Sequence, residues 1–383
     1  MTPPVPPSSA TTDAGVFPSD LSRRSILLGH DWLTGMRGGE RVLETLCGVF
    51  PNAPIHTLLH YPDVISSAIN QHPIHTSWLQ KIPGMRRHYR SFLPVFPFVV
   101  GQFRLPPADL LLTSSHCVAK SLRPAHGTPH LCYCFTPMRY AWTFFEEYFG
   151  SKPLRALAVR PLLAWLRHWD RATAQRVTRF VAISRHVQDR IRQFYGRESD
   201  VVYPPVDTDR CTPGSTAGTR DFDLIVSALV PYKRIELAVS AYSKSGFPLR
   251  IVGVGSERAR LESRAGPNVR FLDWQPDDRV LDLYRNCRLL VFPGEEDFGI
   301  VPLEAQACGK PVVAFGRGGA LETVRDTITG RFFTEPTEPA LRDAVEQAAT
   351  QSWDPAVIRT HARQFGTASF LRGMADCIRR CLA

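Results

Sequence analysis

One stretch constrains the fold of this chain more than any other, because apolar runs and turn residues alternate in it in a fixed order. Residues 289–292 are apolar and precede Pro293-Gly294, which predicts a short buried strand. Pro302 suits the first turn of a helix, Gly309 ends that helix, and residues 311–315 predict the next strand. A strand, helix and strand in this order indicate an α/β fold.

The loop of this unit is acidic. It carries Glu295, Glu296 and Asp297, and Glu304 lies in the first turns of the helix. An apolar strand end gives no structural reason for such a cluster, and carboxylates of this kind are suited to binding hydroxyl groups. The alternative is that these acids are solvated side chains of a loop and a helix.

The sequence Glu-Asp-Phe-Gly-Ile-Val-Pro-Leu-Glu from Glu296 to Glu304, followed by Ala-Gln-Ala-Cys-Gly-Lys-Pro-Val-Val, resembles the donor-site signature of family 4 retaining glycosyltransferases. The resemblance implies that Glu296 lies against the donor sugar and that Glu304 holds the ribose hydroxyls. It also places Phe298, Gly299 and Ile300 at the donor site. The implied architecture is the GT-B fold, an α/β arrangement of two Rossmann-like, doubly wound domains facing each other across a cleft.

Length and composition agree with a globular protein of two domains. The chain has 383 residues, 44% of them hydrophobic, and a net charge of +10. Such a charge favours anionic partners, among which nucleotide sugars, lipid phosphates and nucleic acids all qualify. The nine cysteines are scattered without a zinc-binding spacing, which predicts reduced thiols in a cytoplasmic protein.

The domain boundaries follow from local composition. Residues 1–22 are rich in Pro, Ser and Thr and predict a disordered tail, and residues 206–219 predict a flexible linker. We expect an N-terminal, acceptor-side Rossmann-like domain at 23–205 and a C-terminal, nucleotide-sugar-binding Rossmann-like domain at 220–352. Helices at 353–383 would cross back to the first domain, as in related folds.

Two features of the first half suit a ligand site. Gly38 and Gly39 lie between a strand expected at 25–29 and a helix, where backbone amides can approach an anion; the alternative is a tight turn without a ligand. In the family a similar Gly-Gly turn lies beside the donor diphosphate. His116 ends an apolar strand expected at 109–117, and the family has a histidine at a comparable place that contacts the donor sugar, which predicts a catalytic role.

Two segments, residues 30–39 and 133–142, are similar to a bacterial mannosyltransferase-like branch of the family that builds surface polysaccharides. We expect Asp31 and Arg139 on the acceptor side, since an arginine among aromatic residues suits a sugar-phosphate acceptor. Ordinary packing with a surface arginine is the alternative.

The second half contains candidates for phosphate and base binding. Lys233 and Arg234 open a helix and suit a diphosphate, although Ala228 stands where the family has an arginine five residues before the lysine. The pair Gly253 and Gly255 after the next strand matches the donor site of the family. Trp274 is a candidate for stacking on the nucleotide base. The alternative is that its indole packs in the interior.

Two segments combine basic and apolar residues. Residues 85–104 hold four arginines around a proline-broken aromatic run, and residues 152–197 predict an arginine-rich amphipathic helical region. Either segment suits an anionic membrane surface. A core segment with a solvated flank is the alternative.

Taken together, these patterns predict a retaining glycosyltransferase that transfers a hexose, with mannose from GDP-mannose as the expected donor, to a lipid-linked or polysaccharide acceptor in surface polysaccharide synthesis. Lys233, His116 and Glu296 are the expected catalytic residues. No cofactor or metal is expected, because Lys233, Arg234 and the helix starts can supply the positive charge that a leaving diphosphate needs. Nucleic acid is not an expected partner. The expected location is cytoplasmic, with the inner face of the membrane as a possible peripheral site.

Two other functions remain open at this point. One is a nucleotide-sugar epimerase of the same fold. The other is a non-catalytic basic module that binds membranes or nucleic acid through its arginine-rich surface.

Overall fold

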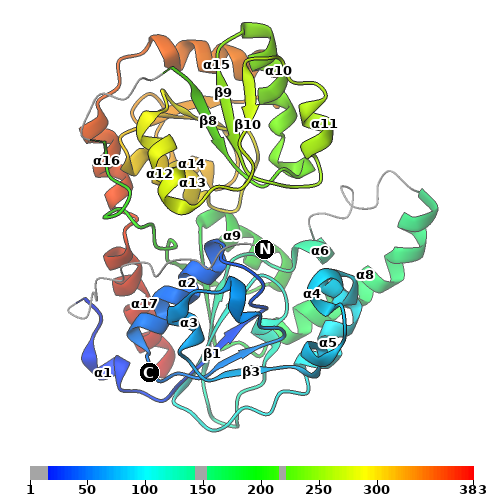
Figure 1. Ribbon diagram of the computed structural model, residues 1–383. Helices are drawn as coiled ribbons and strands as arrows, with labels where there is room; N and C mark the ends of the chain where they lie inside the picture. The colour runs from blue at the N-terminus through cyan, green and yellow to red at the C-terminus, as the bar shows by residue number, and fades with distance from the viewer. Residues whose placement is uncertain (1–15, 143–152, 215–220) are drawn as a thin grey trace. The chain divides into compact units, whose positions relative to one another are not determined.

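The computed structural model describes residues 16–142, 153–214 and 221–383. Contacts within the chain divide it into two units. Unit 1 comprises Met1–Pro205 and Ala368–Ala383, and unit 2 comprises Val206–Thr367. Each unit is built around one parallel β-sheet (Figure 1).

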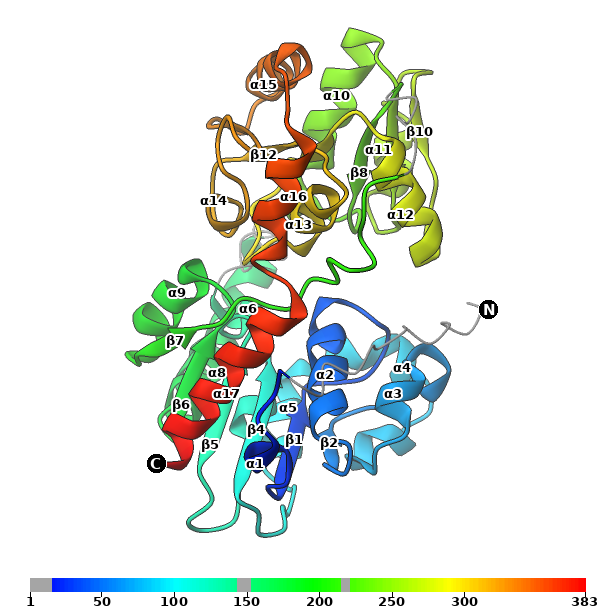
Figure 2. The ribbon, with the colours of Figure 1, turned by 90° about the vertical axis from the view of Figure 1, so that its left-hand side faces the viewer.

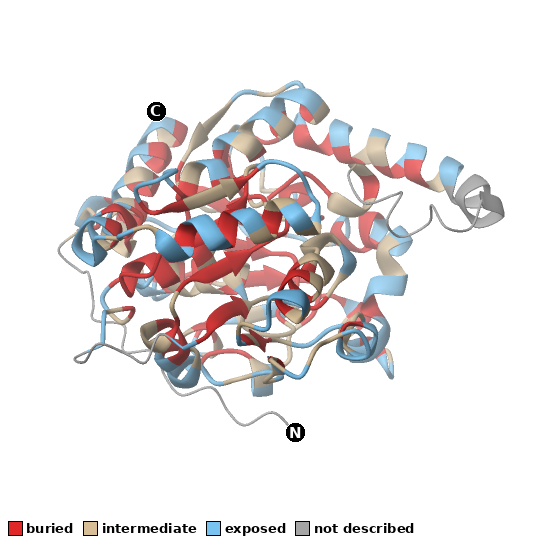
Figure 3. Ribbon diagram, turned by 90° about the horizontal axis from the view of Figure 1, so that it is seen from above, coloured by how far each residue is buried: buried red, intermediate tan, exposed pale blue. Residues whose placement is uncertain are grey.

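The sheet of unit 1 has the strand order β3-β2-β1-β4-β5-β6-β7, and all its pairings are parallel. Its strands are β1 (Ile26–His30), β2 (Ile55–Thr57), β3 (Ile74–Thr76), β4 (Leu110–Ser115), β5 (His130–Cys134), β6 (Arg179–Ala182) and β7 (Ser199–Val201). Every residue of β1, β4 and β5 is buried, because a parallel sheet is covered on both faces. In Figure 3 buried residues are red and are concentrated in the interior of the ribbon, whereas the outer helices carry the pale blue of exposed residues.

Helices surround this sheet in Figures 1 and 2. The described helices of unit 1 are α1 (Ser19–Ser22), α2 (Gly38–Val49), α3 (Ser67–Asn70), α4 (Met85–His88), α5 (Phe96–Val100), α6 (Arg139–Trp142), α8 (Pro153–Ala174), α9 (Arg185–Tyr195) and α17 (Thr367–Leu382). Short 3₁₀ turns are η1 (Pro62–Val64), η2 (Trp78–Lys81), η3 (Tyr89–Val95) and η4 (Ala119–Ser121).

The sheet of unit 2 has the order β10-β9-β8-β11-β12-β13 and is also parallel. Its strands are β8 (Asp223–Val226), β9 (Leu249–Val252), β10 (Val269–Phe271), β11 (Leu290–Phe292), β12 (Val312–Phe315) and β13 (Gly330–Phe333). The helical elements are η5 (Pro231–Lys233), α10 (Ile235–Ser245), α11 (Arg258–Glu262), α12 (Asp277–Asn286), α13 (Ile300–Ala307), α14 (Ala320–Thr323), α15 (Glu338–Thr350) and α16 (Pro355–Arg363).

Alternate strand residues of unit 2 enter different hydrophobic clusters. Val291 and Val313 pack in one cluster with side chains of α10 and α15, whereas Leu290 and Val312 pack in another with side chains of α12 and α13. Because successive side chains of a strand point to opposite faces, both faces of this sheet are buried. Both units are therefore doubly wound α/β structures, as the sequence predicts.

The strand order reverses once in each sheet. The reversal lies between β1 and β4 in unit 1 and between β8 and β11 in unit 2. In open parallel sheets, ligands bind outside the carboxyl ends of the strands at this switch point, because the loops of the two flanking strands diverge there. The two switch points therefore fix where a site can form in each unit.

Most predicted elements are present near their expected positions. The last strand of unit 1, β7, ends at Val201, and Pro204 and Pro205 beyond it have no amide hydrogen for a ladder. Ser184 caps α9 as a hydroxyl acceptor for the amide of Val187, at 3.0 Å.

Two boundary predictions need correction. The disordered tail was expected to reach residue 22, but Phe17 and Leu21 are buried, and the Phe17 ring packs edge-on against Phe50 at 5.3 Å. Residues 1–15 lie outside the described residues. The linker was expected to be flexible from residue 206, but Val206 pairs with Gly366, and Thr212 accepts two hydrogen bonds from Arg285.

The C-terminal helices divide between the units. Helix α16 lies in unit 2, and α17 belongs to unit 1 from Ala368 on. Phe370 of α17 packs edge-on against Tyr133 of β5 at 5.6 Å, and Arg380 pairs with Asp200 at 3.2 Å.

The described residues also bear on membrane-spanning helices and on the state of the cysteines. No helix within the described ranges combines the length and apolarity needed to span a bilayer. All nine cysteines are free thiols and buried, and they lie in both units.

Buried histidines predict how the stability of unit 1 depends on pH. Burial lowers the pKa of His30 to about 4 and that of His130 to about 3, whereas an unfolded histidine titrates near its ordinary value. Between that value and pH 4 the unfolded chain binds protons that the folded chain does not, so the free energy of unfolding falls as pH falls. Each histidine contributes a slope of up to about 1.4 kcal/mol per pH unit.

The measurement is urea unfolding at several pH values between 7 and 4.5. His130→Gln should reduce the slope of the free energy of unfolding against pH by the contribution of one histidine. His126→Gln, at an exposed position, should leave this slope unchanged. An equal slope in all three proteins would contradict the assignment of neutral buried histidines.

Candidate functional site

Asp31 lies at the switch point of unit 1, directly after β1, and its side chain is completely buried. One carboxylate oxygen accepts the amides of Val118 and Ala119 at 2.6 and 2.7 Å, and the other accepts those of His116 and Cys117 at 2.6 and 3.0 Å. The oxygens of Asp31 are therefore directed into the chain, which gives the carboxylate a structural role, and its predicted contact with an acceptor stays a prediction.

The same carboxylate orients the side chain of His116, which follows β4. Nδ1 of His116 lies 2.9 Å from Oδ2 of Asp31. Burial alone would raise the pKa of Asp31, but the charge and hydrogen bonds of His116 lower it well below its usual range. An ionised carboxylate can only accept, so Nδ1 carries the hydrogen, and Nε2 is the nitrogen left for other partners.

Aromatic rings hold the His116 imidazole from the sides. Trp32 contacts it edge-on at 4.7 Å, and the Phe135 ring lies 6.5 Å away. About a third of the His116 side chain stays exposed, unlike the neighbouring His30, which is buried and bonds Ser114 at 2.7 Å. His116 is thus a fixed, partly accessible imidazole at a strand end.

Gly38 and Gly39 form the first residues of α2, beside this cluster. A side chain at Gly39 would come within 3.3 Å of the Phe135 ring. The Glu40 side chain accepts the backbone amide of Arg37 at 3.1 Å and so occupies one donor at the helix start. The predicted contact of this turn with a diphosphate stays a prediction.

Arg139 begins α6, at the loop after β5, and is partly buried. The other end of α6 is fixed by Trp142, whose indole donates to Asp170 at 2.8 Å and stacks on Phe194 at 4.6 Å. The role of Arg139 toward an acceptor stays a prediction.

Lys233 and Glu296 meet at the switch point of unit 2. Lys233 lies in the loop after β8, Glu296 lies in the loop after β11, and their side chains form an ion pair. The two loops pack closely, because a side chain at Gly294 would come within 2.8 Å of the Lys233 backbone. Both side chains are about 15% exposed, so the pair lies at the surface of a tightly packed strand end.

Arg234 follows Lys233 and caps α10 in the left-handed conformation, with φ of 51°. Its guanidinium lies 4.9 Å over the ring of Phe315, at the carboxyl end of β12. The buried Nη1 atom has no hydrogen-bond acceptor among the described residues. The chain thus places a second cation beside Lys233, in the region where Ala228 replaces the family arginine.

Gly253 and Gly255 have a packing role that the sequence does not reveal. Gly253 has φ of +136°, and a side chain there would lie 1.8 Å from the carbonyl oxygen of Ser227. A side chain at Gly255 would lie 2.1 Å from the carbonyl oxygen of Leu229. These glycines let the loop after β9 lie directly on the loop after β8, and their donor contact stays a prediction.

The acidic loop runs into α13, and its residues point in different directions. Asp297 and Phe298 are buried, and Phe298 packs against Phe365 at 6.0 Å. Gly299 caps the helix, and Ile300 is its first residue. Phe298 therefore supports the loop from inside, whereas Glu296 lies at its accessible side.

Glu304 lies one turn into α13 and is partly buried. One of its carboxylate oxygens accepts a hydrogen bond from the Tyr284 hydroxyl of α12 at 2.8 Å. Sequence reasoning missed Tyr284, since a tyrosine in an amphipathic helix carries no local signal of a site. The predicted base partner Trp274 lies between β10 and α12 and is 48% exposed.

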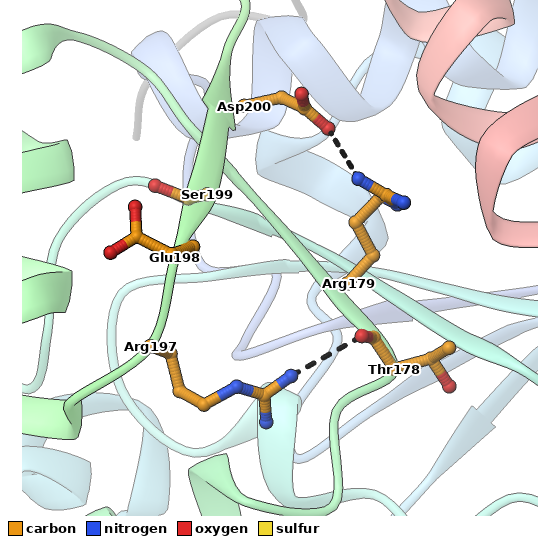
Figure 4. Close-up of a pocket in the computed structure, with 6 residues that line it drawn as sticks. All are labelled: Thr178, Arg179, Arg197, Glu198, Ser199 and Asp200. Atoms are coloured by element: carbon orange, nitrogen blue, oxygen red, sulfur yellow. Dashed lines mark hydrogen bonds and ion pairs between the residues drawn. The ribbon is translucent and has the colours of Figure 1, made fainter.

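A separate hollow of about 290 Å³ lies at the amino-terminal ends of β6 and β7, at the opposite edge of the unit 1 sheet from His116. Figure 4 shows its two arginines turned to partners within the hollow. Arg179 reaches Asp200 at 3.2 Å, and Arg197 donates to the carbonyl of Thr178 at 3.2 Å. Across the described residues, no group of three or more His, Cys, Asp or Glu side chains is arranged to hold a metal ion.

Asp31→Asn tests the anchoring of His116. The NH₂ group of the asparagine would face backbone N–H groups that now donate to a carboxylate oxygen, so these groups would lose their acceptor. We therefore expect a loss of about 3 kcal/mol in the free energy of unfolding. We also expect the ¹⁵N spectrum of His116 to lose the Nδ1–H tautomer that the wild type shows. Urea unfolding and NMR measure the two effects.

The matched control is Asp63→Asn, which removes an exposed carboxylate paired with Arg86 in the same unit. It should leave stability nearly unchanged, because exposed ion pairs contribute little. An unchanged His116 spectrum in folded Asp31→Asn protein would exclude the anchoring role.

Each of the two units matches a known protein family. Residues 36–210 match the model described as Glycosyltransferase Family 4, and residues 214–365 match the model described as Glycosyl transferases group 1. Between them the two matches cover nearly all of residues 36–365.

Curated relatives include the D-inositol 3-phosphate glycosyltransferases of Mycobacteroides abscessus, 35% identical over 191 residues, and of Rhodococcus jostii, 30% identical over 235 residues. The matches cover 40% and 52% of this chain and 43% and 52% of the relatives. The chain thus spans about half the length of the curated relatives that it matches.

Solved structures share the fold over nearly the whole chain. A sucrose-phosphate synthase from Thermosynechococcus elongatus has a TM-score of 0.69 at 18% identity, covering 93% of this chain and 99% of that one. HepE from Anabaena, solved with UDP-glucose, has a TM-score of 0.66 at 18% identity, covering 94% and 100%. The two family matches and the two doubly wound units lead to one conclusion: the chain has the GT-B fold, and its two halves match the family 4 and group 1 glycosyltransferase models.

Proposed function

We propose that the protein is a retaining glycosyltransferase that transfers a hexose from a nucleoside diphosphate sugar, and that unit 2 binds the donor. The observation that carries the proposal is the arrangement at the switch point of unit 2. Lys233 and Glu296 meet there, and the orphaned Nη1 of Arg234 adds an unsatisfied donor. The D-inositol 3-phosphate glycosyltransferases among the relatives support the reaction class.

The chemistry of this cluster suits the leaving group of such a reaction. Departure of a nucleoside diphosphate develops negative charge on the leaving oxygen, and fixed cations and helix amides stabilise that charge. Lys233, Arg234 and the starts of α10 and α13 are the groups that we assign to this task. Glu296 is assigned to the sugar.

For the donor, we propose GDP-mannose, and for the acceptor a lipid-linked or polysaccharide glycan of the cell surface. The support is the likeness of residues 30–39 and 133–142 to bacterial mannosyltransferases of surface polysaccharide synthesis. HepE was solved with UDP-glucose, which makes UDP sugars the first competing donors to test.

Calorimetry with a panel of GDP, UDP, ADP, GDP-mannose, UDP-glucose and NAD tests the proposal. We expect GDP and GDP-mannose to bind to the wild type, and Glu304→Ala and Lys233→Ala to weaken that binding at least about tenfold, since each removes a charged contact. Glu346→Ala, an exposed acid on α15, is the matched control and should bind like the wild type.

Each outcome has a definite meaning. Binding of UDP and UDP-glucose in place of the guanine nucleotides would keep the donor site and replace mannose. Binding of NAD alone, or of no nucleotide, would contradict the proposal. Turnover of the donor to a different nucleotide sugar without acceptor would indicate an epimerase instead.

We further propose that unit 1 docks on anionic membrane surfaces through a basic face, defined by Arg86, Arg87, His88 and Arg90 and by Phe98. The four basic residues are exposed on α4 and the start of η3, and Phe98 of α5 is 65% exposed. Their buried neighbours Tyr89, Phe96 and Val99 join one hydrophobic cluster, so the exposed residues are presented by a packed support.

The composition of this face suits an interface between water and lipid. Basic residues gain energy near anionic headgroups, and an exposed aromatic ring enters the boundary of the acyl chains. Trp165 of α8, 47% exposed, protrudes from a helix whose Leu163 and Leu166 enter the same cluster.

Co-sedimentation with vesicles tests the membrane proposal. We expect binding to vesicles that contain phosphatidylglycerol and not to vesicles of phosphatidylcholine alone. The double variant Arg87→Glu, Arg90→Glu should weaken binding at least about tenfold, because each position exchanges attraction for repulsion. Arg264→Glu with Arg270→Glu, at exposed positions of unit 2, is the control, and equal loss in both variants would reject this face.

A further inference from the structure

Tyr284 lies on α12 and is almost completely buried, and its hydroxyl reaches across to Glu304 on α13. The distance from the Tyr284 hydroxyl to Oε2 of Glu304 is 2.8 Å. The two residues are twenty positions apart in sequence, and only the packing of α12 against α13 brings them together. Glu304 is the residue that the family signature assigns to the ribose hydroxyls.

The direction of this hydrogen bond is fixed. A carboxylate can only accept, so the tyrosine donates. Burial and then the charge of Glu304 raise the pKa of Tyr284 well above its usual range, so the hydroxyl keeps its proton at any ordinary pH. Glu304 therefore has a permanent donor on one of its two oxygens.

We propose that Tyr284 is a positioning residue that fixes the Glu304 carboxylate for the two hydroxyls of a ribose, and so makes the donor site selective for ribonucleotides. This inference rests on the proposed function and names a determinant of specificity within the same site. A glutamate side chain has three rotatable bonds, and holding one oxygen fixes the direction of the other.

The consequence for binding is a dependence on the ribose. A carboxylate held in place meets the ribose diol without first losing its side-chain freedom, whereas a mobile one must lose that freedom on binding. Removing the Tyr284 hydroxyl should therefore weaken the binding of a nucleotide that has both ribose hydroxyls. The binding of a nucleotide that has neither hydroxyl should stay nearly unchanged.

The chain offers a closely matched control in Tyr242 of α10. Tyr242 is likewise almost completely buried in unit 2, and its hydroxyl donates to the carboxylate of Asp223 at 2.5 Å. Asp223 begins β8, so this second pair lies at the amino-terminal edge of the sheet, away from Lys233 and Glu296. Tyr242→Phe reproduces the loss of a buried tyrosine–carboxylate hydrogen bond at a distance from the carboxyl ends of the strands, where the candidate site lies.

The experiment is calorimetry of Tyr284→Phe and Tyr242→Phe with GDP and UDP and with their 2′,3′-dideoxy analogues. We expect Tyr284→Phe to weaken binding of the ribonucleotide about tenfold, equivalent to about 1.4 kcal/mol, and to change dideoxy binding less than about twofold. Tyr242→Phe should bind both like the wild type. Equal weakening of both nucleotides by Tyr284→Phe, or none, would overturn the inference.

Glu304→Gln gives a second test that leaves the tyrosine in place. If Tyr284 holds the amide carbonyl, the NH₂ group faces the ribose, and binding should fall to the level of Glu304→Ala. Retention of near wild-type affinity would mean that the side chain turns freely, which also overturns the inference. A wild type that binds no nucleotide would overturn the proposed function itself, and the inference with it, whereas failure of Tyr284→Phe alone leaves the donor site standing.

Discussion

The reversal of strand order in each parallel sheet is the constraint on which the rest of the site depends. Strands that all run one way bring their carboxyl ends to a single edge, and at the switch point the flanking loops separate. Each switch point holds an acid and a base from two strands that are distant in sequence, Asp31 with His116 and Lys233 with Glu296.

The two pairs differ in burial. Asp31 is sealed in the interior and bound by the backbone, which suits a fixed orientation, whereas both members of the second pair keep some exposure, which suits exchange of partners with an anionic ligand.

Much of the fold could be predicted because its signals are local. Continuous apolar runs define buried parallel strands, and proline and glycine mark where elements begin or end. The acidic signature after β11 is equally local, which is why Glu296 and Glu304 could be assigned to a site. Phe17 and Leu21 were missed, since two apolar residues in a stretch rich in Pro, Ser and Thr form no period.

The functional details that escaped prediction depend on direction and on contacts between distant segments. The sequence places Asp31 at a strand end, but nothing in it says that the carboxylate turns inward to four amides. Tyr284 belongs to a helix with an ordinary amphipathic pattern, and its role depends on the packing of that helix against α13. The glycines after β9 were assigned to a ligand from their motif, but their contacts show that loop-to-loop packing already requires them.

The burial of all nine cysteines has a consequence for how the molecule can be followed in solution. Burial raises the pKa of Cys132 and Cys377 to about 12, so neither thiol is ionised at ordinary pH. Thiolates, not thiols, react with alkylating and disulfide reagents. Cys132 and Cys377 are therefore protected twice, by burial and by protonation, and they react only when the surrounding structure opens. Unit 1 contains Cys132 and Cys377, and unit 2 contains Cys287 and Cys308. The rate at which a reagent modifies each sulfur therefore reports how often the structure around it opens in its own unit.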